Sequence, residues 1–186
     1  MTMTTERPGR MRLGEGDRVA ALAQARALIR NDGGREDALL ATMIDEAFSL
    51  AEQFTGRALI VRDLTETVVA DATWRRLTAT PVRAVTGVAT AAGGEALPVD
   101  AYSVDIDAAG DGWVRVRRDA RVAVVTLSAG LAEDWDSLPP GIAGGVVRLA
   151  AHRFTTRDDD GVPPAAVAAL WRPWRRMRLH GLAAPA

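Results

Sequence analysis

The stretch AEQFTGRAL, residues 51–59, marks the point where the sequence changes from a helical to a strand-like periodicity. Over residues 35–55, apolar residues recur at steps of three and four, which predicts an amphipathic helix. Gly56 follows the last of them, in the position of a common helix stop. Residues 59–129 are instead rich in Val and Thr and are cut at short intervals by Gly, Asp and Pro, which is typical of strands. The apolar positions of the predicted helix are Leu40, Met43, Ile44, Ala47, Ala51 and Phe54.

Upstream of this helix, residues 17–30 predict a shorter one, which the turn-forming NDGG at 31–34 separates from it. Downstream, Val114 and Val116 alternate with Arg115 and Arg117, so we expect a sheet with one face in solvent. Glycine-containing segments at 91–94 and 108–112 predict hairpin turns. The strand candidates are 63–71, 73–78, 82–90, 101–105, 112–118 and 121–128.

Two further helices are expected after LPPG at 138–141, over residues 142–154 and 163–171, and Pro173 should stop or kink the second. The predicted fold class is therefore α+β: a helical core with an inserted antiparallel β subdomain and an extended C-terminal tail. The expected divisions are a flexible N-terminus (1–16), an N-terminal helical pair (17–57), the inserted β subdomain (58–130), a C-terminal helical pair (131–171) and the tail (172–186).

The composition limits the possible functions. With 48% hydrophobic residues in 186, the chain can bury a core, and its net charge of −1 argues against a dedicated nucleic-acid binder. The apolar runs are too short to cross a membrane, and the polar start predicts a protein made in the cytoplasm. There is no cysteine, and no catalytic, phosphate-binding or metal-binding motif is present. We therefore expect no enzyme activity, no cofactor and no metal.

The C-terminal stretch AALWRPWRRMRLHG, residues 168–181, is the most unusual part of the chain, because it combines two tryptophans with four arginines and no acidic residue follows Trp171. Three interpretations are open. Trp171 and Trp174 could pack on the chain's own core and leave the arginines in solvent. The arginines could bind nucleic-acid phosphates. Alternatively, the segment could dock on a protein partner, since Trp and Arg are enriched at interface hot spots.

The order of several motifs resembles the head–tail connector (adaptor) family of tailed phages and phage-like gene transfer agents. The resemblance spans residues 13–180 and includes Trp74 on an early strand. The third-helix segment departs from the family in carrying His152, Arg153 and Phe154 where an aromatic pair often precedes the arginine. The motifs are RVAALAQARALIRNDGGREDALLATMIDEAFSLAEQFTGRAL (18–59), of which AEQFTGRAL (51–59) is the most telling part, TPVRAVTGV (80–88), AYSVD (101–105), VVTLSAG (124–130), LPPGIAGGVVRLAAHRFTTR (138–157) and VPPAAVAALWRPWRRMRL (162–179).

This resemblance implies a structural protein of the particle neck, assembled in the bacterial cytoplasm. Twelve copies would form a ring beneath the portal protein and contact the next neck or tail-side protein, while DNA passes through the channel without sequence-specific binding. No membrane is involved. The alternative is a basic-tailed DNA-binding adaptor. The expected portal-binding residues are Trp171, Arg172, Trp174, Arg175, Arg176, Met177, Arg178 and Leu179, and a possible partner face of the β subdomain, otherwise a solvated face, carries Arg115, Arg117 and Arg118.

Overall fold

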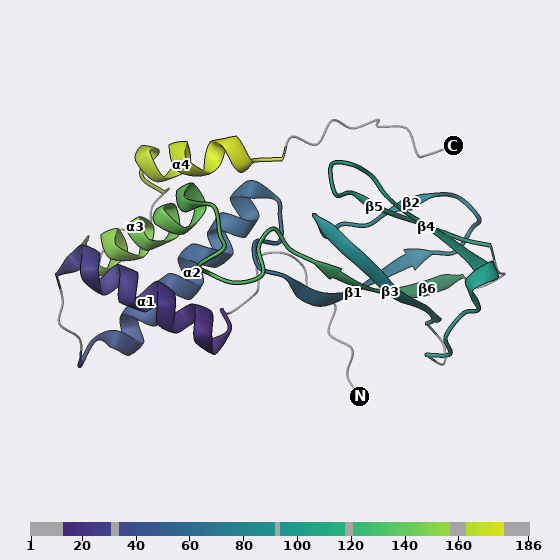
Figure 1. Ribbon diagram of the computed structural model, residues 1–186, viewed down its shortest axis with the longest axis horizontal. Helices are drawn as coiled ribbons and strands as arrows, with labels where there is room; N and C mark the ends of the chain where they lie inside the picture. The colour runs from purple at the N-terminus through teal and green to yellow at the C-terminus, as the bar shows by residue number, and fades with distance from the viewer. Residues whose placement is uncertain (1–12, 31–33, 92–93, 118–120, 157–162, 177–186) are drawn as a thin grey trace. The chain divides into compact units, whose positions relative to one another are not determined.

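The computed structural model describes residues 13–30, 34–91, 94–117, 121–156 and 163–176. The chain divides into two compact units, which we call the β unit and the helical unit (Figure 1). Of the described residues, the continuous segment Val61–Leu131 belongs to the β unit, and those of Pro8–Ile60 and Ala132–Arg176 belong to the helical unit. Helices and antiparallel sheets are both present, so the predicted α+β class is confirmed.

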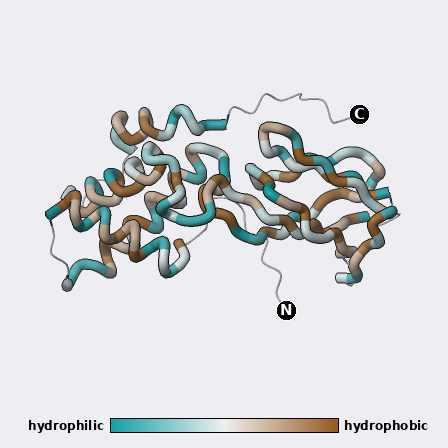
Figure 2. Tube along the Cα trace, viewed as in Figure 1, coloured by the Kyte–Doolittle hydropathy of each residue, from teal (hydrophilic) through white to brown (hydrophobic). Residues whose placement is uncertain are grey.

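The long helix predicted before residue 56 is α2 (Asp37–Thr55). Its apolar side chains at three- and four-residue spacing form the buried face, and Figure 2 shows hydrophobic and hydrophilic residues alternating along the helices of this unit. Gly56 ends the helix with a φ of +67°, a conformation that favours glycine, and its N–H donates to the Glu52 carbonyl at 2.8 Å. The predicted stop signal is confirmed. The buried apolar residues are Leu40, Ile44, Ala47, Phe48 and Ala51.

The first helix, α1 (Glu15–Ile29), packs against α2 and α3 through the fully buried Ala21 and Ala25. Leu13, which precedes α1, is 3% exposed, and its N–H donates to Asp45 Oδ1 at 3.1 Å. Ordered structure therefore begins before residue 17, the start of the helical pair expected from the sequence. Residues 1–12 of the predicted flexible N-terminus lie outside the described residues.

The chain leaves and re-enters the helical unit at adjacent points. The Leu59 N–H donates to the buried carboxylate of Glu52 at 2.9 Å, and the Leu59 carbonyl accepts from the Ala132 N–H at 3.0 Å. A segment whose two ends lie side by side can be inserted into a helical core without separating the helices around it. This pairing explains how a β region fits between α2 and α3.

The β unit consists of two three-stranded antiparallel sheets, with strand orders β1-β6-β3 and β2-β5-β4. All six predicted strands are present, although β2 is only two residues long. A core of mainly Val and Leu side chains comes from both sheets, as expected for two sheets packed face to face. The strands are β1 (Arg62–Val69), β2 (Arg75–Arg76), β3 (Val82–Thr90), β4 (Tyr102–Ile106), β5 (Gly112–Val116) and β6 (Val122–Ala129), and the short helix η1 (Val99–Ala101) precedes β4.

The last two α-helices are α3 (Pro140–Thr156) and α4 (Ala165–Trp171), followed by the 3-10 turn η2 (Arg172–Trp174). α3 contacts all three other helices, and most of its side chains are buried. α4 ends two residues before Pro173, in agreement with the predicted stop.

Candidate functional site

The contact between α3 and α4 depends on two glycines one helical turn apart. A Cβ added to Gly141 would lie 3.2 Å from the Leu170 carbonyl oxygen. One added to Gly145 would lie 2.9 Å from both Cδ1 and Cε2 of Trp171, and closer still to its Nε1. The sequence analysis did not single out these glycines, although their spacing of four in GIAGG was a signal that a helix packs closely there.

Trp171 fills the space that Gly145 leaves open. Its side chain is fully buried, its Nε1 donates to the Ile142 carbonyl at 3.3 Å, and its ring centroid lies 5.8 Å from that of Phe54. The indole of Trp171, one of the expected portal-binding residues, is therefore enclosed by the helical unit. Of the three interpretations of the C-terminal stretch, the first holds for this residue.

The residues after Trp171 follow the surface of the helical unit as far as Arg176. The Trp174 carbonyl accepts from Arg57 Nε at 3.2 Å, and the Arg176 N–H donates to the Thr55 carbonyl at 2.8 Å. The last turn of α2 contains no basic residue, so Arg176 brings positive charge to the negative end of that helix dipole. The first five residues of the predicted tail thus belong structurally to the helical unit.

The described end of the chain presents two arginines to solvent. Arg172 and Arg175 are exposed, whereas Trp174 and Arg176 are half-buried. The Arg175 guanidinium carbon lies 5.6 Å from the centroid of the Phe54 ring, which limits the freedom of that side chain. Of the other expected portal-binding residues, Met177, Arg178 and Leu179 lie outside the described residues.

A second concentration of arginine and tryptophan lies on the sheet β2-β5-β4. Val114 and Val116 of β5 point into the core, so the alternation of a strand puts Trp113 and Arg115 on the opposite, outer face. Cross-strand pairing adds residues from β2 and β4 to this face. We call it the Trp/Arg face. Its members are Trp74, Arg76, Ser103, Asp105, Trp113, Arg115 and Arg117.

The guanidinium groups on the Trp/Arg face rest on aromatic rings or on neighbouring polar groups. The guanidinium carbon of Arg115 lies 4.8 Å from the Trp74 ring centroid, and that of Arg76 lies 5.9 Å from the Trp113 ring centroid. Arg117 is exposed, and its Nη2 donates to Ser103 Oγ at 3.0 Å. The structure therefore brings together two of the three arginines expected on a partner face; Arg118 lies outside the described residues.

Sequence analysis did not place the tryptophans on this face. Trp74 and Arg76, like Trp113, Arg115 and Arg117, follow a period of two that was visible in the sequence. No local signal in the sequence indicates that β2 pairs with β5. This pairing brings the two sets of residues together on one face of the sheet.

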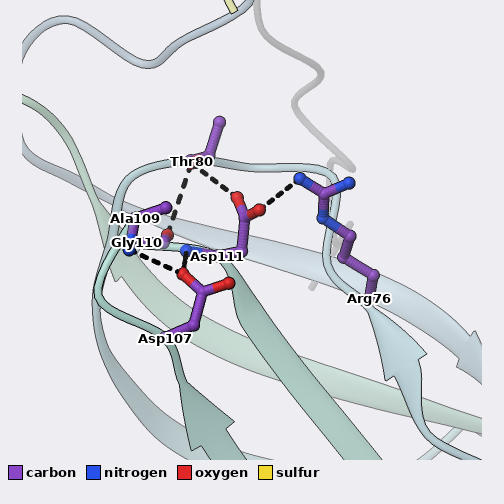
Figure 3. A network of polar contacts seen from close by, with 6 residues as sticks. All are labelled: Arg76, Thr80, Asp107, Ala109, Gly110 and Asp111. Carbon is purple, nitrogen blue, oxygen red and sulfur yellow. Dashed lines mark hydrogen bonds and ion pairs between the residues drawn. The ribbon is translucent and has the colours of Figure 1, made fainter. Parts of the chain in front are cut away.

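A buried carboxylate fixes the edge of the Trp/Arg face (Figure 3). Asp111 is 4% exposed, forms an ion pair with Arg76 and accepts from Thr80 Oγ1 at 3.2 Å. Asp107 caps the preceding turn, since its Oδ1 accepts from the Ala109 and Asp111 N–H groups, both at 2.9 Å. The hairpin turn predicted at 108–112 is thus confirmed. The network orients Arg76 beside Trp113.

The turn that positions Trp74 is held by Asp71. Its Oδ1 accepts from the N–H and the hydroxyl of Thr73, at 3.2 and 2.6 Å, and the carboxylate also pairs with Arg75. The Arg75 guanidinium, followed by Thr73, lowers the pKa of the Asp71 carboxyl from 3.8 to about 2. Because the ionised form is favoured, these hydrogen bonds persist in mildly acidic solution.

The pKa of Asp71 leads to a pH prediction for the β unit. Its value is lower in the folded chain than in the unfolded one, so its contribution to stability is complete above about pH 4 and is lost as the pH falls through about 2. A carboxyl carbon NMR titration of the full chain should give Asp71 a midpoint near 2. A midpoint near 4, the ordinary value for aspartate, would contradict the described hydrogen bonds.

The described residues offer neither a membrane-spanning helix nor a metal-binding cluster. None of their helices is both long enough and apolar enough to cross a membrane. They also contain no group of three or more His, Asp or Glu side chains placed to hold a metal ion.

The chain is similar to solved structures over nearly its whole length. It matches a chain of the neck of an empty gene transfer agent particle computed with C6 symmetry, at 25% identity and a TM-score of 0.70, with 97% of each chain covered. It matches a chain of the virion of a native gene transfer agent particle at 26% identity and a TM-score of 0.68, again with 97% of each covered. A third match, from the neck of a native particle computed with C12 symmetry, has 22% identity, a TM-score of 0.67, and 97% and 98% coverage.

No protein family model and no curated protein sequence matches the chain. The structural matches nevertheless include both units, because almost no part of either chain is left out of the alignment. The resemblance to neck proteins of gene transfer agents, predicted from the order of short motifs, is confirmed.

Proposed function

We propose that this chain is a head–tail connector of a phage-like particle, with a structural and non-enzymatic role. Copies of it form a ring beneath the portal, join the DNA-filled head to the tail, and leave a channel for DNA. The observation that carries this proposal is the match along 97% of both chains to a neck protein of a gene transfer agent particle. A shared fold over both units supports a shared place in the particle better than similarity of one unit would.

The proposal of a ring is supported by the symmetry of the matched neck, which was computed with C6 symmetry. Twelve copies, the number implied by the connector resemblance, are compatible with that symmetry. A ring of identical subunits needs two different complementary surfaces on each copy, and its contacts close by rotation. The connector and its ring are assembled in the bacterial cytoplasm as part of the particle.

The C-terminal segment is the proposed attachment to the portal. Trp171 and the hydrogen bond from the Arg176 N–H to Thr55 hold the start of this segment against the helical unit. Arg172 and Arg175 are exposed there, and Met177, Arg178 and Leu179 follow. A segment anchored at its base loses less conformational freedom on docking than a free tail does, and arginines pair strongly with carboxylates. Trp171 thus acts in portal binding as the anchor of the segment inside this chain.

Binding to the portal ring encoded with this chain tests the proposal. The full chain should bind the portal, and a chain ending at Arg176 should bind at least tenfold more weakly, because it lacks the expected docking residues from Met177 onward. This truncation retains Trp171 and so leaves the helical core intact, as an unchanged unfolding midpoint would verify.

Duplex DNA serves as the competing ligand in the same experiment. If the portal binds neither chain while DNA retains the full chain in a strongly salt-dependent way, the connector proposal is wrong and the basic-tailed DNA-binding adaptor replaces it.

A further inference from the structure

The Trp/Arg face carries two cations, Arg115 and Arg117, that no carboxylate of the described residues neutralises. Within the described part of the chain, neither Arg115 nor Arg117 forms an ion pair, although Arg75 and Arg76 do. Arg115 is half-buried against Trp74, and a half-buried guanidinium without a counter-charge is less stable than a paired one. A partner that supplies carboxylates would provide the counter-charges for Arg115 and Arg117.

Unused hydrogen-bond donors lie on the same face. Trp74 Nε1 and Arg115 Nε are each buried and have no hydrogen-bond acceptor among the described residues. Donors that are sheltered from water and left unpaired favour a ligand rich in oxygen acceptors, because pairing them recovers the free energy lost by desolvation.

The arginines are also held in place before any partner arrives. Arg115 rests on the Trp74 ring, and Arg117 is hydrogen-bonded to Ser103. A guanidinium stacked on a ring keeps in-plane N–H groups for bidentate pairing with a carboxylate. Because these side chains are ordered beforehand, less conformational entropy is lost on binding.

Nucleic acid fits this face less well than an acidic protein does. Trp113 is only 8% exposed and Trp74 is contacted by a guanidinium, so neither ring is open for a base to stack on. Asp105 lies directly across from Trp113 in the sheet register and would repel a phosphate. Carboxylates presented one at a time by a protein can avoid Asp105 and still reach Arg115 and Arg117.

We propose that the Trp/Arg face is a docking surface for an acidic segment of another protein of the particle. Carboxylates of that segment pair with Arg115 and Arg117, and its backbone carbonyls accept from Trp74 Nε1. The inference rests on the proposed function, since it places the partner in the neck, but it concerns a unit and a contact other than the portal-binding segment. Binding hot spots are enriched in tryptophan and arginine and lie near the centre of an interface, where they become buried. The Trp74–Arg115 pair has this composition.

The occupant can be identified in assembled particles. A photo-crosslinking amino acid placed at position 105, on the same face and across from Trp113, should join this chain to one other particle protein at a segment that contains Asp or Glu. Crosslinks to DNA, to a second copy of this chain or to a segment without acidic residues would overturn the proposal, and so would the absence of any crosslink.

A charge reversal tests whether the contact matters. In particles made with Arg117→Glu, the protein identified by crosslinking should fall at least tenfold relative to the portal, as measured by quantitative mass spectrometry. Arg121→Glu is the matched control, because Arg121 is also an exposed arginine of the β unit but lies before β6 and outside the Trp/Arg face. That variant should retain the wild-type composition.

The two proposals fail in different ways in this experiment. If Arg117→Glu particles contain this chain and all other proteins in normal amounts, the docking proposal is wrong and the connector function stands. If wild-type particles lack this chain altogether, the connector function is wrong as well.

Discussion

Replacing Gly145 with alanine is expected to lower the free energy of unfolding of the helical unit by about 3 kcal/mol. The new Cβ would lie 2.9 Å from two ring atoms of Trp171 and closer to Nε1, so the indole must move. The displaced ring loses its burial and its hydrogen bond to Ile142. Urea denaturation followed by circular dichroism at the helical band, together with amide hydrogen exchange in α3 and α4, measures the change.

Gly144→Ala is the matched control for this prediction. It makes the same substitution in the same helix, one residue away, but a Cβ at Gly144 meets no atom within 4 Å. Alanine is favoured over glycine inside a helix, so this variant should be more stable by about 0.5–1 kcal/mol. Equal effects of the two substitutions would mean that Trp171 does not occupy the space beside Gly145.

Removing the Asp111 carboxylate is expected to destabilise the β unit by about 3 kcal/mol. In Asp111→Ala, Arg76 loses its ion-pair partner and the buried Thr80 hydroxyl loses an acceptor. Amide hydrogen exchange resolved to β5 and β6 should show faster opening there, with little change in α3. The effect should be largest inside the β unit, because Asp111, Arg76 and Thr80 all belong to that unit.

Asp63→Ala provides the comparison for that result. Asp63 is an exposed carboxylate of β1 in the same unit, and its removal should change stability by less than about 0.5 kcal/mol. If both aspartate variants behave alike, the Asp111 network contributes nothing particular to the fold. Some other interaction would then have to hold Arg76 in place on the Trp/Arg face.

The sequence predicts the elements of this fold well because local patterns determine them. The change of period around Gly56 and the alternation of Val114 with Arg115 are visible within a few residues, and α2 and β5 form where they are expected. β2 is shorter than predicted because only Arg75 and Arg76 pair with β5. Pairing length depends on the partner strand, which local patterns do not describe.

The candidate sites were less predictable, because they depend on contacts between distant residues. Trp171 is enclosed because Gly145, 26 positions earlier, leaves room for the indole. Arg115 is ordered by Trp74, which reaches it only through the pairing of β2 with β5. Sequence analysis identified Trp171 and Arg115 as candidate site residues, but whether a tryptophan faces its own core or a partner is decided by packing.

The central claim, that this chain is a neck connector, is tested most directly by counting its copies in purified particles. Quantitative mass spectrometry should give one copy of this chain for each portal subunit, as a connector ring stacked on the portal requires. Absence of the chain from purified particles, or a copy number comparable to that of the proteins of the head shell, would contradict the claim.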